Sequence, residues 1–470
     1  MKKIYSKTLS LALLPFLGTS LYAAEYLAPA NAVEDDHAYE TVDHTDDKKD
    51  GYLLGEGWKL NGDLRVGYVN YDYSNDPKNP NPNTNKGHTD SKGIYVLPKL
   101  SITSPEYNGL SFKVTGAGST DFGINDPLYE TRTFGFGSDL SSYIILQEAY
   151  IKYVNGDHTF LAGNYELSTP MVDADDWYLF ANTFQGAYYK NTSIENMMFA
   201  GGYIYKMAGP WDSGADGANF HTIADTSYVP NNDGGPDYKA MAGDAGMWAG
   251  VVQYTKDEHN LQLWDYYAVD LYNTFFGQYD YNAKFDGGSY DAGVQIIDFQ
   301  GVGALKSTAA LDPNFQGIDY SIFSLRFDTK LDSGFDLSTG ASFYTDGPGT
   351  GATLGAWGGY PYLANGMIFH FFEAGDLRNT NSYKLQLGYD FGEQGVDGLW
   401  VGTRFTYFDL DPKYSISSET GLGQEYQKNY GLRMSYSHDT GYYFTGTYEY
   451  VDLDQQPSIS ALRLIGGYKF

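Results

Sequence analysis

The sequence predicts an all-β protein, an 18-stranded antiparallel transmembrane β-barrel with short turns at one end and long loops at the other. Three observations predict it: an alternation of period two from residue 58 onward, connections that alternate in length, and an unusual composition. The 470 residues include 45 Tyr, 27 Phe and 56 Gly, yet the mean hydropathy is -0.42. Beyond the N-terminus, no stretch approaches the roughly 20 apolar residues of a membrane helix. We therefore expect strands, not helices, to cross the membrane.

The alternation is clearest in the last ten residues, where one face carries Leu462, Leu464, Tyr468 and Phe470. The other face carries small or charged residues such as Arg463. This pattern is typical of a half-buried strand. The predicted strands are 58–73, 93–104, 110–122, 143–154, 158–168, 182–190, 197–207, 246–256, 260–272, 278–286, 289–300, 318–330, 335–345, 380–391, 398–410, 428–438, 442–452 and 460–470.

The connections and the apolar face distinguish a membrane barrel from a soluble β-sandwich. Short links such as 155–157 and 439–441 alternate with long ones such as 208–245 and 346–379. Short turns on one side and long loops on the other are typical of outer-membrane barrels. A sandwich core would favour Val, Ile and Leu, whereas this face is heavy in Tyr, Phe and Gly.

The N-terminal residues set the export route and the domain boundaries. Lys2, Lys3 and Lys7 precede a short apolar run, so residues 1–24 are predicted to be a signal peptide. Residues 25–57 form an acidic segment, either a flexible leader or a short plug or periplasmic contact. Residues 58–470 are the predicted barrel domain. We expect the protein in the outer membrane of a Gram-negative cell.

Charge and cysteine content exclude several functions. The chain has 30 Lys+Arg and 59 Asp+Glu, and loss of the three lysines of the signal peptide changes its charge to 27 minus 59, or -32. Such a charge argues against nucleic-acid binding, which needs clustered bases. The absence of cysteine excludes disulfides and thiolate metal sites.

Charged residues within the strands fall opposite the apolar face. A Lys or Arg that faces lipid costs ~2–4 kcal/mol at the membrane midplane, so we expect these charges to face the lumen. The lumen is therefore predicted to be polar and water-filled. Asp265 is an exception, because it shares the parity of Leu261 and Leu263; either a bulge or a different register would explain it. Barrel closure groups a predicted basic ladder on one wall: Arg65, Lys384, Arg404, Arg433 and Arg463. These charges could steer solutes or brace the wall as salt bridges.

Eighteen strands make a barrel too wide to be filled by its own wall side chains, so an inward loop should narrow it. The first candidate is the compact loop 169–181. With the facing wall it supplies a predicted constriction and acidic wall: Glu148, Asn164, Glu166, Asp173, Asp175, Asp176, Trp177 and Tyr178. The second candidate is the loop 346–379, with His370, Phe371 and Phe372, because an exposed loop would seldom carry so many aromatics.

Three neighbouring segments, 147–153, 161–170 and 182–187, read QEAYIKY, LAGNYELSTP and NTFQGA. In combination they resemble the outer membrane porin D (OprD) family. The resemblance implies a substrate-preferring porin for small solutes, with the third long loop, residues 169–181 here, folded into the lumen. Asn164 stands where the family often has a basic residue, and Trp177–Phe180 contains no arginine. With the acidic balance, this predicts a pore that leans toward cations or is only weakly selective.

We therefore expect passive diffusion of small polar solutes and ions, with no enzymatic role and no cofactor. The eight histidines pair with no visible nucleophile. Asp173, Asp175 and Asp176 lack the glycine and glutamate of an EF-hand loop, so no metal is predicted. Expected partners are outer membrane lipid, the barrel assembly machinery through Phe470, and further copies in a possible homotrimer. The alternative is a structural or adhesive surface barrel whose long loops bind a partner.

Overall fold

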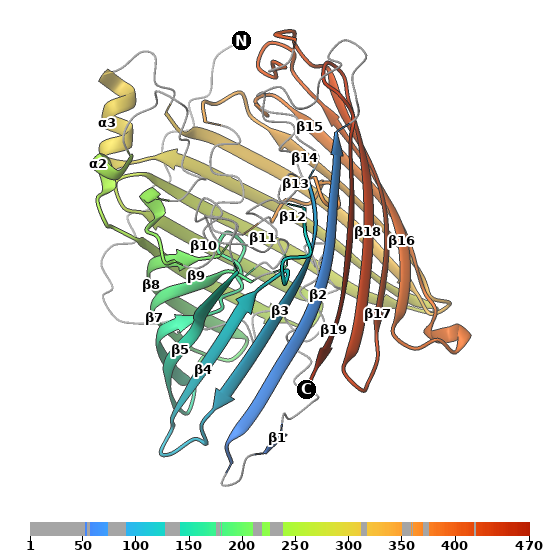
Figure 1. The fold of residues 1–470 in the computed structure, drawn as a ribbon. Coiled ribbons are helices and arrows are strands. Elements are labelled where there is room, and N and C mark those ends of the chain that lie inside the picture. The colour runs from blue at the N-terminus through green and yellow to red at the C-terminus, as the bar shows by residue number, and fades with distance from the viewer. Residues whose placement is uncertain are drawn as a thin grey trace.

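The computed structural model describes residues 52–53, 57–73, 91–126, 142–174, 179, 181–209, 219–225, 238–311, 317–349, 359, 361–369, 376–417 and 420–470. Within these ranges, strands β2 to β19 form one closed antiparallel barrel (Figure 1). Each strand pairs with the next along the chain, and β19 pairs with β2 to close the ring. The predicted signal peptide and nearly all of the predicted acidic segment lie outside these residues.

The eighteen barrel strands in the described ranges correspond one to one with the predicted segments. Their bounds are β2 Lys59–Tyr73, β3 Ser91–Thr103, β4 Leu110–Ser119, β5 Tyr143–Asn155, β6 His158–Tyr165, β7 Thr183–Asn191, β8 Met197–Ala208, β9 Met247–Lys256, β10 His259–Ala268, β11 Tyr272–Phe285, β12 Gly288–Gly301, β13 Asp319–Leu331, β14 Phe335–Tyr344, β15 Asn381–Asp390, β16 Leu399–Asp409, β17 Tyr426–Ser437, β18 Tyr442–Leu453 and β19 Ile459–Lys469. A two-residue strand, β1 (Tyr52–Leu53), pairs with the start of β2.

Short turns gather at the end of the barrel where β2 begins and β19 ends (Figure 1). The opposite end carries the longer connections, including the short helices η1 (Ile223–Asp225), α2 (Tyr238–Ala242) and α3 (Gly303–Leu311). A further 3-10 turn, η3 (Gly392–Gln394), lies between β15 and β16. No helix in the described ranges has the length and apolar character needed to span a membrane.

The boundary between β10 and β11 differs most from the expectation. The sequence pattern predicts strands 260–272 and 278–286. Instead, β10 ends at Ala268 and β11 begins at Tyr272, with a turn of three residues between them. Asp270 adopts a φ of 62° there, a left-handed conformation that Asp tolerates better than most residues.

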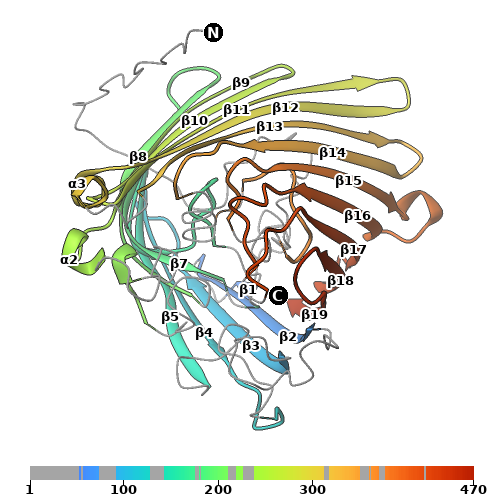
Figure 2. The same ribbon diagram turned by 90° about the horizontal axis from the view of Figure 1, so that it is seen from above.

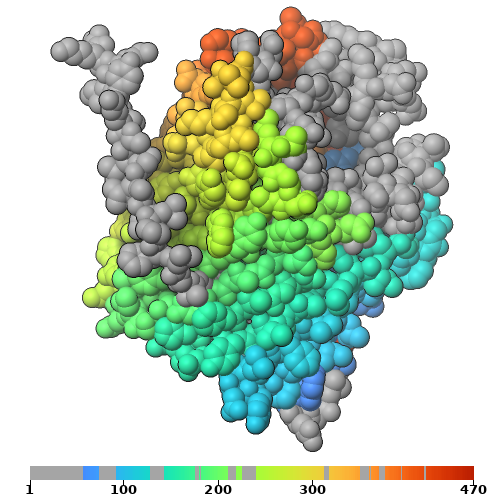
Figure 3. Space-filling model, turned by 90° about the vertical axis from the view of Figure 1, so that its left-hand side faces the viewer, coloured from blue at the N-terminus to red at the C-terminus, as the bar shows by residue number. Residues whose placement is uncertain are grey.

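The two faces of each strand differ as predicted from parity. On β15, Tyr383, Leu385 and Leu387 are exposed on the outer face, whereas Lys384 and Gln386 are buried toward the lumen. The outer face of the wall is a continuous surface of side chains over the neighbouring strands (Figure 3). In a membrane barrel this outward surface meets lipid.

Aromatic pairs line the outer face near the short turns. Phe335 packs edge-on against Tyr389 with ring centroids 4.6 Å apart. The rings of Tyr442 and Tyr468 are 4.7 Å apart. Amphipathic rings at the level of the lipid headgroups form the girdle that is typical of membrane barrels.

Asp265 lies on the outer face, and neither a bulge nor a register error explains it. The pairing of β10 with both neighbours is continuous over His259–Ala268. Asp265 lies three residues before the strand ends, and its carboxylate accepts a hydrogen bond of 2.9 Å from Asn273 Nδ2. Its position near the long-loop end and its hydrogen bond reduce the cost of facing outward, because this cost falls toward the membrane interface.

Candidate functional site: the lumen and its inward-folded loops

The loop between β6 and β7, which we call loop 3, crosses the lumen. At one side, Tyr266 on β10 lies with its hydroxyl 3.4 Å from the backbone nitrogen of Met171. At the other side, Leu179 packs where a side chain on Gly67 of β2 would lie, and its carbonyl accepts a hydrogen bond from Arg65 Nη1 at 3.3 Å. Loop 3 thus touches strands far apart on the ring.

A β-bulge helps to hold loop 3. Thr115 pairs with Glu148, but Gly116 pairs with Leu146, so Gln147 is an extra residue on β5. An extra residue of this kind redirects its side chain. Gln147 Nε2 donates a hydrogen bond of 3.1 Å to the carbonyl of Ala181 at the end of loop 3.

The loop between β14 and β15, which we call loop 7, also folds inward over its described residues 361–369 (Figure 2). Side chains of four strands bind its backbone carbonyls. Wall side chains donate hydrogen bonds to loop carbonyls: Gln295 to Pro361 (2.5 Å), Ser382 to Ala364 (3.0 Å), Thr406 to Asn365 (2.7 Å), Arg404 to Gly366 (3.2 Å) and Asn429 to Phe369 (2.6 Å).

The two loops meet each other inside the barrel. A Cβ on Gly359 of loop 7 would lie only 2.3 Å from the carbonyl oxygen of Pro170 in loop 3. The ring of Phe369, the last residue of the described stretch 361–369, packs edge-on against Tyr71 on β2, with centroids 5.3 Å apart. Together the loops occupy lumen space from β2 round to β18.

The structure places all five residues of the predicted basic ladder on the lumen face of neighbouring strands. Arg463 and Arg433 lie opposite the same residue of β18, Thr447. Arg404 donates to Gln386 Oε1 at 2.8 Å and to Asn365 Oδ1 at 3.2 Å. Arg65, Lys384, Arg404 and Arg463 are buried, and Arg433 is half-buried. Arg65 and Arg404 are therefore also bound to the inward loops.

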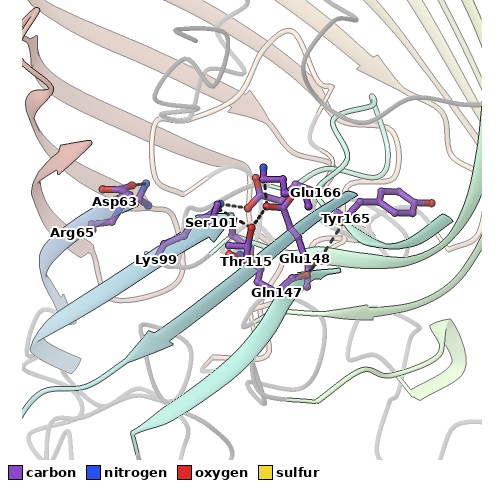
Figure 4. A network of polar contacts seen from close by, with 12 residues as sticks. Asp63, Arg65, Lys99, Ser101, Thr115, Gln147, Glu148, Tyr165 and Glu166 are labelled. Atoms are coloured by element: carbon purple, nitrogen blue, oxygen red, sulfur yellow. Dashed lines mark hydrogen bonds and ion pairs between the residues drawn. The ribbon is translucent and has the colours of Figure 1, made fainter. Parts of the chain in front are cut away.

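The predicted acidic wall is closely paired with lysines (Figure 4). Glu148 lies 2.9 Å from Lys113 Nζ and accepts a hydrogen bond of 2.6 Å from Thr115. Glu166 forms an ion pair with Lys99. Both carboxylates are buried, so each sits in a locally neutral pair on the wall beneath loop 3.

Asn164 does not face the lumen. It continues the alternation of Phe160 and Ala162, which are exposed on the outer face, and it accepts a hydrogen bond of 3.1 Å from Gln185. Asp173 lies in loop 3, where its carbonyl accepts a bond of 3.3 Å from Asn182. The other predicted constriction residues lie outside the described part of the chain: Asp175, Asp176, Trp177, Tyr178, His370, Phe371 and Phe372.

Two groups of lumen residues were not singled out from the sequence as site residues. Glu449 on β18 is buried against loop 7. Arg326 on β13 is buried among Asp280, Asp291 and Asp328. Their parity marks them as lumen-facing, but no local pattern indicates which groups they meet, because their partners come from other strands and loops.

Comparisons with known proteins now identify the family. The model of the outer membrane porin, OprD family, matches residues 149–442, more than half of the chain. The chain belongs to the OprD family of outer membrane porins. It is therefore a channel protein of the outer membrane for small solutes, as the resemblance predicted. A search of curated proteins finds no match.

Solved OprD-family porins share the barrel at low sequence identity. Pseudomonas aeruginosa OccK9 (OpdG) is 15% identical with a TM-score of 0.70, and the match covers 89% of this chain and 99% of that one. A BenF-like porin from Pseudomonas fluorescens Pf-5 is 15% identical with a TM-score of 0.67, covering 89% and 100%. Acinetobacter baumannii OccAB3 is 15% identical with a TM-score of 0.65, covering 88% and 99%. At this identity the likeness concerns the fold.

Proposed function

We propose that loops 3 and 7 together form the constriction of this OprD-family porin, through which small polar solutes and ions diffuse passively. The observation that supports this is the pair of loops held across the lumen, one between Tyr266 and Arg65 and the other along the wall from Gln295 to Asn429. A barrel of this width can discriminate among solutes only if inward-folded segments narrow its lumen. In this proposal the protein performs no chemistry.

The proposed ion preference is for cations, and it depends on the loops. The wall beneath loop 3 does not supply it, because Glu148 and Glu166 are paired with lysines while the ladder adds positive charge. We propose that the excess of acids over bases in the whole chain, 59 against 30, acts mainly from the loops and the acidic segment 25–57. Charges at a pore mouth raise the local concentration of oppositely charged ions.

The basic ladder suggests how a carboxylate solute would interact with the same pore. The structurally similar Pseudomonas aeruginosa OpdK was crystallised with vanillate, which carries a carboxylate. In the present chain, half-buried Arg433 is the ladder residue most open to such a group. Guanidinium groups recognise carboxylates, so we propose that a carboxylate solute would contact Arg433.

Planar-bilayer recording tests the proposal. Purified protein should give discrete conductance steps, and a salt gradient should give a reversal potential of the sign for cation preference. A reversal potential of anion sign would show that the ladder dominates the loops. Protein that is folded yet never conducts would overturn the porin proposal and favour a structural or adhesive surface barrel.

We also propose two protein partners, the barrel assembly machinery and further copies of this chain. Phe470 closes the last strand against Gly62, with backbone hydrogen bonds of 2.9 and 3.0 Å, and we propose that this aromatic terminus is read by the barrel assembly machinery. A homotrimer is the proposed assembly. Cross-linking in native outer membranes, followed by gel electrophoresis, would show a trimer band or a monomer alone.

A further inference from the structure

Glu449 stands out among the wall residues that contact loop 7. The five anchors described above donate hydrogen bonds to loop carbonyls, whereas Glu449 accepts from loop N–H groups. Its Oε1 accepts from Met367 N at 2.8 Å, and its Oε2 accepts from Ile368 N at 2.5 Å and Phe369 N at 2.6 Å. Three successive amides therefore converge on one carboxylate.

The carboxylate of Glu449 accepts hydrogen bonds from N–H donors at both of its oxygens. Asn429 Nδ2 is the fourth donor to this carboxylate and binds Oε1 at 3.1 Å, so each oxygen accepts two hydrogen bonds. The same nitrogen donates to the carbonyl of Phe369, and Asn429 is itself oriented by Gln427 at 2.9 Å. Hydrogen bonds from several N–H groups stabilise a charged carboxylate, and they are stronger than bonds between neutral groups.

The loop is shaped for this contact. A Cβ on Gly366 would lie 2.7 Å from Glu449 Oε1 and 2.2 Å from the carbonyl oxygen of Phe369. A Cβ on Gly431 of β17 would lie 2.5 Å from the sulfur of Met367. Glycine at both positions thus lets the loop approach the wall closely enough for its amides to reach Glu449. The exposed fractions of Glu449, Asn429 and Ile368 are each 1%.

We infer that Glu449 is the positioning residue that latches loop 7 inside the lumen, acting as an anionic cap on the amides of residues 367–369. Without the carboxylate, three buried amides lose their acceptor, and buried unsatisfied donors are costly. The N–H groups of loop 7 then form hydrogen bonds more easily with water, which requires the loop to leave its present position. The effect on conductance rests on the proposed function, since it requires loop 7 to narrow the pore.

The chain contains no cysteine, so a single introduced thiol reports on one position. Ile368→Cys places this thiol in the buried part of the loop without removing the backbone N–H. We would measure its reaction rate with a water-soluble methanethiosulfonate reagent in the otherwise unchanged porin. The same rate would be measured in the Glu449→Gln and Gly366→Ala backgrounds, with unitary conductance recorded for each protein.

Asp336→Asn is the matched control. It also removes one carboxylate from the lumen face, and Asp336 Oδ2 accepts a hydrogen bond of 2.7 Å from the wall residue Trp400 through its Nε1. Heat-modifiable migration on gels would verify that each barrel is folded. We expect Glu449→Gln and Gly366→Ala to raise the labelling rate at least about tenfold, because charge-assisted bonds are lost, while the control stays at the starting rate.

The outcomes separate the latch from the constriction. Faster labelling with higher conductance supports both. Faster labelling at unchanged conductance supports the latch and overturns the proposal that loop 7 narrows the pore. An unchanged labelling rate in folded Glu449→Gln protein, or an equal rise in Asp336→Asn, overturns the latch.

Discussion

The strongest test of the lumen wall concerns Arg326, which binds three carboxylates at once. Its Nη2 lies 3.0 Å from Asp280 and 2.6 Å from Asp291, and its Nε lies 3.1 Å from Asp328. These side chains come from three adjacent strands and are between 2% and 11% exposed. Gly293 lies between them, where a Cβ would be 2.7 Å from Asp280 Oδ1.

Replacing Arg326 with Met keeps much of the side-chain volume but removes the guanidinium. The three acids then face one another without this guanidinium between them. Breaking a buried ion pair by removing one partner costs about 3–5 kcal/mol, because the remaining charge is left uncompensated. Three carboxylates contact this one guanidinium, so we expect a loss at the upper end of that range.

Urea unfolding in phospholipid vesicles, followed by the fluorescence of the seven tryptophans, would measure the loss. The control combines Arg326→Met with Asp280→Asn and Asp291→Asn, which removes two of the stranded charges. This variant should recover most of the lost stability, since contacting residues are not additive. A loss below about 1 kcal/mol for Arg326→Met, or a combined variant no better than the single one, would refute the assigned ion-pair energy.

Three further results are expected. Leu325→Arg, on the outer face of β13, should lower the free energy of unfolding by ~2–4 kcal/mol in the same assay. Leu325→Phe should lower it only slightly. Equal effects of the two variants would mean that this face does not contact lipid. Gly62→Leu should lower the folded fraction in outer membranes, because a Cβ at this position would lie 2.2 Å from the ring of Phe470. Gly466→Ala should leave the folded fraction unchanged, because the atoms nearest to a Cβ there are 3.7 Å away. Arg433→Gln should shift the reversal potential toward cation preference and leave the conductance unchanged. Arg404→Gln should cause the same shift and also raise the conductance, because Arg404 forms hydrogen bonds to loop 7. Identical effects of the two variants would contradict this difference.

The sequence was sufficient for the barrel because strand parity is a local property. Lipid on one side and a polar lumen on the other impose an alternation that each strand shows by itself, as Lys384 between Tyr383 and Leu385 illustrates. The prediction was weakest at the tight turn around Asp270, where no glycine or proline marks the end of the strand. Asn164 was misjudged because its place in a family motif, rather than its parity, was used to assign it to the constriction.

The contacts of the lumen could not be predicted in the same way. Glu449 lies 82 residues along the chain from Met367, the first of the amides from which it accepts, and nothing near it in sequence distinguishes it from a pore-lining acid. Glu148 and Glu166 were assigned to an acidic wall, but their lysine partners on β3 and β4 depend on cross-strand neighbours. Such pairings follow from three-dimensional register, which parity alone does not determine.

These contacts change the meaning of a polar lumen face. Polar residues inside a wide barrel were taken as evidence of a water-filled interior, yet Gln295, Ser382, Thr406, Asn429 and Glu449 are all at most 1% exposed. Each binds the backbone of loop 7. An inward loop brings its own N–H and C=O groups into the barrel, and those groups need partners once water is displaced. Part of the wall's polarity therefore exists to hold the loop, and substitutions there should change pore size as well as pore charge.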